Sequence, residues 1–138
     1  AFQRLRKYPT FRRTFAEFVT QTEVSKEMLE QLEAFTCALY GSKNMNDINE
    51  LRYAMFCAKR GMIESNQLPL CRDSLQNHIR RANYQCLIWR LCLEQFPDIP
   101  GLEDHGWEYN HGDVTILWMN GQPAPEAEEV ILELTVCV

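Results

Sequence analysis

The chain has 138 residues, of which 46% are hydrophobic and 24% are charged, and its formal net charge is −5. This length favours a single domain over residues 1–138, and this composition excludes a globally disordered chain. No apolar run approaches the ~20 residues that a membrane-spanning helix needs, so we expect no membrane partner.

Two helices are predicted in the first 41 residues. The first covers about 11–20, where Thr10 acts as its cap after Pro9 has stopped any earlier helix, and it places four residues on one face: Phe11, Phe15, Phe18 and Val19. The second begins near Ser25 and ends at Gly41, and its apolar residues recur at helical spacing: Met28, Leu32, Phe35 and Leu39.

A third and a fourth helix follow. Asp47 with Glu50 forms a capping-box pattern at the start of a helix that ends at Gly61. The fourth helix, over 71–96, is the expected centre of the core, because its apolar residues alternate by four and three: Leu75, Ile79, Ala82, Cys86, Trp89, Leu93 and Phe96. Pro97 and Pro100 are expected to end it.

After Gly101 the apolar residues recur with a period of two, which is typical of strands. Trp107 and Tyr109 precede a His111-Gly112 turn and are expected to face three residues across a hairpin: Val114, Ile116 and Trp118. Alternation over 130–136 predicts a third strand. The predicted fold class is therefore α+β: a mainly helical bundle of about four helices over 1–100, followed by a small antiparallel sheet over 101–138.

Metal binding and catalysis find little support in the sequence. None of the six cysteines forms a C-x-x-C pair, and Cys71 and His78 lie seven residues apart, roughly 10 Å along a helix, which does not suit one tetrahedral zinc. His105 and His111 lie further along the chain. Cys71, at a helix start beside Arg72, is the candidate nucleophile, although a packed thiol is the preferred interpretation. We expect no metal, no cofactor, no small-molecule substrate and no enzymatic activity.

The cysteines also bear on the compartment. Without a secretory signal, buried free thiols in a reducing, intracellular location, the nucleus included, are the better expectation. Cys57 and Cys86 fall within helical apolar patterns, where a thiol packs as a small hydrophobic group.

The charges are distributed unevenly. All 14 basic residues lie within residues 1–90 beside nine acids, whereas residues 91–138 hold ten acids and no Lys or Arg. The first 13 residues carry five cations and no acid: Arg4, Arg6, Lys7, Arg12 and Arg13. Such a segment can bind the phosphate groups of a nucleic acid. It can equally be the solvated end of a helix, or it can pair with the acidic residues of 91–138.

Nucleic acid is the best supported of the specific partners. Arg80 and Arg81 on the long helix extend the basic surface that the five N-terminal cations begin, and these seven residues form the predicted DNA- or RNA-binding site. Against this, the chain as a whole is acidic and has no recognised nucleic-acid-binding motif. A protein partner that contacts the aromatic hairpin and the acidic half is the alternative.

Several phrases resemble, as a group, the C-terminal segment of a large set of uncharacterised, mobile-element-associated animal proteins. The phrases are LEAFTCALYG at 32–41, LRYAMFCAKRG at 51–61, LPLCRDSLQNHIRRANYQCLIW at 68–89, HGW at 105–107, and ILWMNGQPAPE through LELTVC at 116–137. In that family a nuclease-like region precedes the segment and a cysteine-rich, zinc-binding tail follows it. The resemblance implies an accessory module of a nuclease-like protein, and if the chain is trimmed it implies that Cys137 is the first ligand of the tail.

Overall fold

The structure is a computed structural model that describes residue 3 and residues 8–42 and 44–121. Its helices and strands are α2 (Pro9–Thr20), α3 (Lys26–Leu39), α4 (Ile48–Ala58), a short 3-10 helix η1 (Ser65–Gln67), α5 (Arg72–Leu91), β1 (Trp107–Asn110) and β2 (Asp113–Ile116). The predicted α+β class, with a helical bundle before a small antiparallel sheet, is confirmed. The predicted strand over 130–136 and Cys137 lie outside the described residues.

The helix starts follow the capping residues with one exception. The Ser25 hydroxyl accepts a hydrogen bond from the Met28 amide (3.2 Å), and the Asp47 carboxylate accepts from the amides of Asn49 (2.8 Å) and Glu50 (3.1 Å), as expected. The prediction that Thr10 caps this helix was wrong, because Pro9 is itself the first residue of α2 and Tyr8 is its N-cap. Proline has no N–H to leave unpaired at that position and its fixed φ suits a helix.

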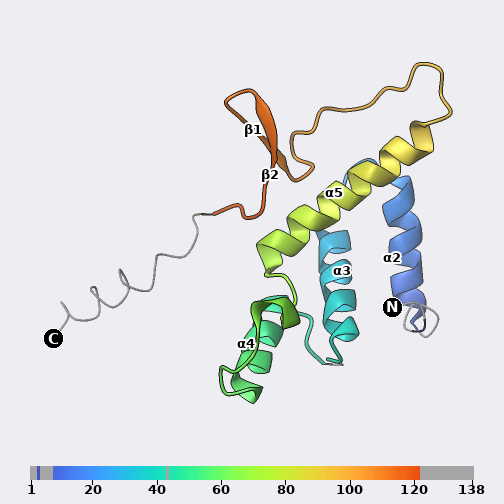
Figure 1. Cartoon of the computed structure of the whole chain (residues 1–138). Coiled ribbons are helices and arrows are strands. Elements are labelled where there is room, and N and C mark those ends of the chain that lie inside the picture. Colours follow the sequence, from blue (N-terminus) through green and yellow to red (C-terminus); the bar gives the residue numbers. More distant parts are fainter. Residues whose placement is uncertain (1–2, 4–7, 43, 122–138) are drawn as a thin grey trace.

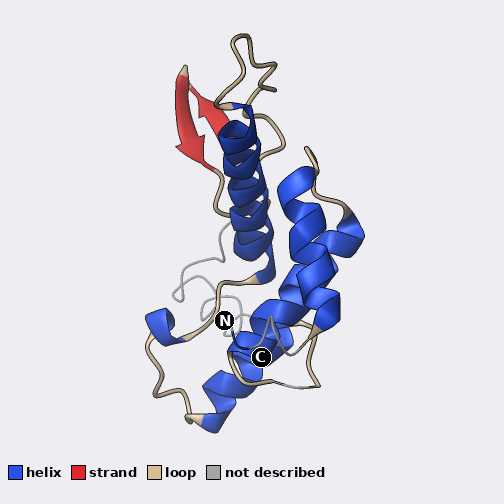
Figure 2. Cartoon of the chain, turned by 90° about the vertical axis from the view of Figure 1, so that its right-hand side faces the viewer, coloured by secondary structure: helices blue, strands red, loops and turns tan. Residues whose placement is uncertain are grey.

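Helix α5 lies between two other layers, the α2–α3 pair on one side and the β-hairpin on the other (Figures 1 and 2). The core forms where α2, α3 and the start of α4 meet the near side of α5, and its buried members are Phe18, Met28, Leu29, Leu32, Cys37, Ile48, Leu51, Leu75 and Ile79. Burial of this apolar surface is the main force that holds the helices together.

The apolar stripe of α5 is buried only over its first half. Leu75 and Ile79 lie in the core and Ala82 and Cys86 pack against it, but α5 ends at Leu91 rather than at residue 96. Trp89, Leu93 and Phe96, the rest of the predicted stripe, are 66%, 95% and 86% exposed. Leu93 and Phe96 follow the end of α5, so helical spacing no longer holds them on its buried face. Near this end Arg90 donates a hydrogen bond to the carbonyl of Thr20, the last residue of α2.

The hairpin forms with the predicted register. Trp107 pairs with Ile116 and Tyr109 with Val114, so these four side chains share one face of the two-stranded sheet. His111 (φ 51°) and Gly112 (φ 94°) form the turn, and two successive positive φ angles are what a tight antiparallel hairpin requires. Among the described residues, no helix has the length and apolar character needed to cross a membrane.

Candidate functional site

A second stripe on α5 holds the hairpin in place. Its members, Ser74, Asn77, Arg81 and Tyr84, are spaced by three, four and three residues, which places them on one face of the helix. Each donates at least one hydrogen bond to the segment over 100–120. Ser74 donates to Trp118 O (2.9 Å) and Asn77 donates to Asn120 Oδ1 (3.1 Å). Arg81 donates to Gly106 O (2.8 Å) and Leu117 O (3.0 Å), and Tyr84 donates to Pro100 O (3.0 Å). We call these four residues the hairpin-facing stripe.

Arg81 is the centre of this stripe. One of its guanidinium nitrogens, Nη1, donates to two carbonyl oxygens, Gly106 O before β1 and Leu117 O after β2, and the guanidinium lies 5.5 Å from the centre of the Trp118 ring. Gly106 O also accepts from the Leu117 amide (3.1 Å). Burial lowers the pKa of Arg81, although a guanidinium remains charged at neutral pH. Arg81 therefore closes the base of the hairpin onto α5.

Gly106 allows the backbone to approach α5 this closely. Its φ is +84°, and a Cβ at this position would lie 2.5 Å from the carbonyl oxygen of Asn77. A side chain there would meet the rigid helix backbone, so only glycine fits without a shift. Trp107, the next residue, packs edge-on against Tyr84 with ring centres 5.3 Å apart, and His105 lies 4.8 Å from the same ring.

The hairpin and Trp118, which follows it, present apolar side chains to solvent. Tyr109 is 57% exposed, and Val114, Ile116 and Trp118 are between 41% and 59% exposed. We call these four residues the hairpin surface. The hairpin surface is thus apolar, exposed and mounted on a helix through polar contacts at its base.

A cavity of about 590 Å³ lies beside the hairpin. Two aromatic residues and three acids line it together with one arginine: Trp107, Tyr109, Glu103, Asp104, Glu108 and Arg80. Asp104 adopts a positive φ of 61°, a conformation that Asp tolerates better than most residues. Arg80 Nη1 donates to the Asn77 side-chain oxygen (3.0 Å).

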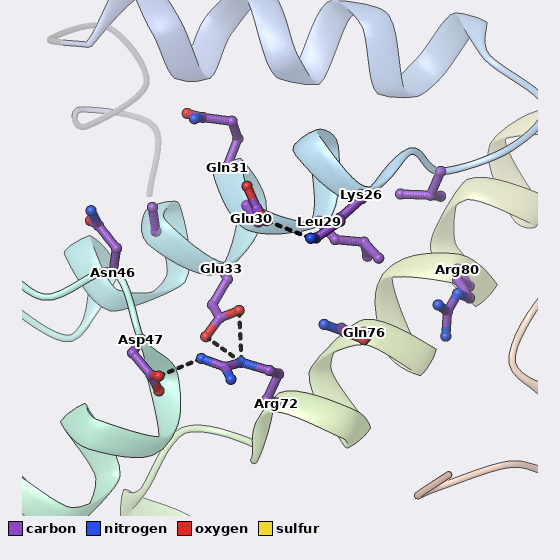
Figure 3. A pocket seen from close by; sticks show the side chains of 12 residues that line it. Lys26, Leu29, Glu30, Gln31, Glu33, Asn46, Asp47, Arg72, Gln76 and Arg80 are labelled. Carbon is purple, nitrogen blue, oxygen red and sulfur yellow. Dashed lines mark hydrogen bonds and ion pairs between the residues drawn. The ribbon is translucent and has the colours of Figure 1, made fainter.

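A wider polar groove of about 810 Å³ runs between α3 and α5 (Figure 3). Its lining includes an ionic cluster in which Arg72 Nε lies 3.1 Å and 3.2 Å from the two oxygens of Glu33, and Arg72 Nη2 lies 2.5 Å from Asp47. Glu33 also accepts a hydrogen bond from the Ile48 amide (2.8 Å), so three helices meet at this cluster.

The charges in the cluster stabilise one another. The carboxylates of Asp47 and Glu33 raise the pKa of Arg72, and the amide of Glu50, followed by Arg72, lowers the pKa of Asp47. Since each acid already has a basic partner, the cluster acts as a structural joint. The groove also contains Lys26, which pairs with Glu30 at 3.9 Å across its rim, and Arg80 (Figure 3).

The seven predicted cations fall in different places. Arg4, Arg6 and Lys7 lie outside the described residues. Arg12 and Arg13 are exposed in the N-terminal half of α2, whose other end meets α5 (Figure 1), and Arg13 lies 3.8 Å from Glu17. Arg80 and Arg81 are half-buried on α5, and both make the hydrogen bonds described above. The described members are thus two separate pairs.

The cysteines and histidines are dispersed over the described residues. No group of three or more His, Cys, Asp or Glu residues in the described ranges is placed to hold a metal ion. Cys71 donates to the Ser74 hydroxyl (3.2 Å), and His78 is exposed. Cys37 is buried, but Cys57 and Cys92 are exposed, so the expectation of buried thiols was wrong for these two. Cys57 lies near the end of α4, and Cys92 directly follows the last residue of α5.

The sequence analysis missed the ionic cluster and the hairpin-facing stripe. Glu33 lies four residues from both Leu29 and Cys37, inside the buried face of α3, and a carboxylate there needs a charged partner. The three-four-three spacing of the stripe was also visible in the sequence. Comparison of the chain with protein-family models, with curated proteins and with solved structures found no match.

Proposed function

We propose that this chain is a non-enzymatic protein-binding module that docks a partner on the hairpin surface. One observation carries the proposal: four large apolar side chains, Tyr109, Val114, Ile116 and Trp118, are each more than two-fifths exposed on a hairpin whose base is bound to α5. A fixed apolar surface with aromatic anchors is what protein interfaces use at their centres, because rigid side chains lose little entropy on binding.

The hairpin's attachment supports this proposal. An isolated two-stranded hairpin is marginally stable in water. Here the hairpin-facing stripe supplies five hydrogen bonds to the segment that carries the strands. A binding surface mounted in this way is ordered before a partner arrives, which reduces the cost of association.

A peptide library displayed on phage tests the proposed function. The immobilised full chain should select peptides with a shared pattern, and a Tyr109→Ser/Trp118→Ser variant should bind those peptides at least tenfold more weakly by calorimetry. The matched control is Tyr53→Ser/Phe56→Ser, which removes two exposed aromatics from α4. Selection of no shared pattern, or equal loss in both variants, would contradict the proposal.

Nucleic-acid positioning is the second candidate, and the exposure of Arg12 and Arg13 on α2 favours it. If the chain positions nucleic acid, it acts as the accessory module of a nuclease-like protein, as the family resemblance implies. Neutralising Arg4, Arg6, Lys7, Arg12 and Arg13 should abolish oligonucleotide binding in fluorescence anisotropy, and each lost phosphate contact should flatten the log-affinity against log-salt slope by about 0.7–0.9. Absence of binding even at low salt would reject this candidate.

A further inference from the structure

We propose that the cavity beside the hairpin binds a lysine or arginine side chain of the partner protein. The inference rests on the proposed docking function and names the chemistry of the partner. Its starting point is the cavity's lining, which includes Trp107 and Tyr109. These two residues occupy alternate positions of β1, so their side chains lie on one face of the hairpin.

Aromatic rings attract cations through the negative potential of their faces, and the attraction increases when the site is partly shielded from water. Trp107 is half-buried and its ring is held edge-on by Tyr84, 5.3 Å away, whereas Tyr109 is 57% exposed. One ring is therefore held against α5 and the other is accessible to solvent. The stem of a lysine or arginine can pack on such rings while its charged end remains near polar groups.

The charges around the cavity select for a cation. Glu103, Asp104 and Glu108 line it, against the single positive charge of Arg80. Arg80 donates to the Asn77 side chain, which gives its guanidinium a partner within the protein. The imbalance also extends beyond the cavity, because the described residues from 91 to 121 include six acids and no Lys or Arg. A basic segment of a partner would be attracted to this whole half of the molecule, since charges of one sign steer oppositely charged ligands.

The experiment is an NMR titration of the ¹⁵N-labelled full chain with three probes. They are acetyl-Gly-Lys-Gly-amide, the same peptide with norleucine in place of lysine, and tetramethylammonium chloride. We expect saturable shifts of the Trp107 indole N–H and of the Gly106 and Tyr109 amides with the lysine peptide, and none with the norleucine peptide. Equal shifts with both peptides, or no saturable shift, would overturn the proposal. Binding of tetramethylammonium without binding of the lysine peptide would overturn the assignment to a side chain.

Two variants locate the site. Tyr109→Ala should weaken binding of the lysine peptide about three- to tenfold, the range expected for one cation–π contact. Glu103→Gln/Asp104→Asn should weaken it by at least as much and reduce its salt dependence, and Asn at 104 still tolerates the positive φ. The control, Glu94→Gln/Asp98→Asn, removes the same charge from two exposed positions outside the cavity and should weaken binding clearly less than Glu103→Gln/Asp104→Asn does. Unchanged binding in both cavity variants would overturn the proposal.

The two proposals fail in different ways. Peptides selected by phage display that depend on the hairpin surface but contain no Lys or Arg would overturn the cation-binding cavity and leave the docking function intact. A lysine peptide that binds at the cavity, when no displayed peptide depends on the hairpin surface, would support the cavity and contradict the docking function.

Discussion

The guanidinium of Arg81 donates a hydrogen bond of 2.8 Å to the carbonyl oxygen of Gly106, twenty-five residues later in the chain. This contact joins the central helix to the base of the hairpin at the point where a glycine lets the two backbones approach. The approach depends on Gly106 having no Cβ, and the first prediction tests that dependence.

Gly106→Ala should destabilise the protein by about 1–3 kcal/mol more than Gly112→Ala. Both glycines have positive φ, +84° and +94°, so both substitutions carry the conformational cost of about 1–2 kcal/mol. At Gly106 the new methyl group would meet the carbonyl oxygen of Asn77, at 2.5 Å, whereas no atom of the described residues lies within 4 Å of the methyl position at Gly112. Urea unfolding of the two variants measures the difference, and equal losses would show that the close approach is not required.

Glu33→Gln should lower the free energy of unfolding by about 1–3 kcal/mol, because it removes the charge that pairs with Arg72 while keeping an acceptor for the Ile48 amide. The matched control is Glu30→Gln on the same helix, where the ion pair with Lys26 is exposed and should be worth less than about 0.5 kcal/mol. Thermal and chemical unfolding compare the two variants. Equal effects would remove the ionic cluster from the account of how α3, α4 and α5 are joined.

Stability should fall with rising pH between about 9 and 11 because of Cys37. Burial, with the nearby Glu33 and Asp47 carboxylates, raises the pKa of this thiol from 9.0 to about 11. The folded protein therefore keeps the proton that the unfolded chain loses, so the contribution is complete below pH 9 and is lost as pH rises through 11. Cys37→Ala should flatten this part of the pH profile and Cys57→Ser should not. Parallel profiles for the wild type and Cys37→Ala would contradict the assignment.

Ile79→Asp should prevent folding, and Leu93→Asp should change stability by less than about 0.5 kcal/mol. Ile79 is 7% exposed in the core, where an unpaired charge costs several kcal/mol against a total stability of about 5–15, whereas Leu93 is 95% exposed. The sequence places both residues in one apolar stripe, so this pair separates the buried half of that stripe from the exposed half. Circular dichroism melting curves provide the measurement, and a cooperative melt of Ile79→Asp would contradict the core assignment.

The sequence was sufficient to predict the local elements. A helix begins directly after Ser25 and Asp47 caps the next one, as predicted, and the His111-Gly112 turn sets the hairpin register. What it could not predict was the length of α5, because the same four-three spacing continues through Trp89 to Phe96, although the helix ends at Leu91 and these side chains are exposed. Periodicity reports which residues can share a face, whereas burial depends on what lies opposite.

Arg81, at the candidate site, illustrates the same limit of prediction from sequence: the residue type does not identify its partners. Its charge and its place on a helix predict a phosphate contact as readily as an internal one, and its acceptors here are the backbone carbonyls of Gly106 and Leu117. Every residue has a carbonyl, so no side-chain pattern in the sequence could have identified the partners of Arg81. Glu33 was more accessible to prediction, because an acid within a buried face indicates a basic partner even where the partner is unknown.

Amide hydrogen exchange in the wild type and in Arg81→Met tests most directly the claim that α5 fixes the hairpin in place. The Leu117 amide, which donates to Gly106 O (3.1 Å), reports on the base of the hairpin, and Arg13→Met, on exposed α2 surface, is the control. We expect Leu117 and the β1–β2 amides to be protected in the wild type and in Arg13→Met, and to exchange at least tenfold faster in Arg81→Met while α2 and α3 remain protected. Hairpin amides that exchange at the same rate with and without Arg81 would contradict the claim.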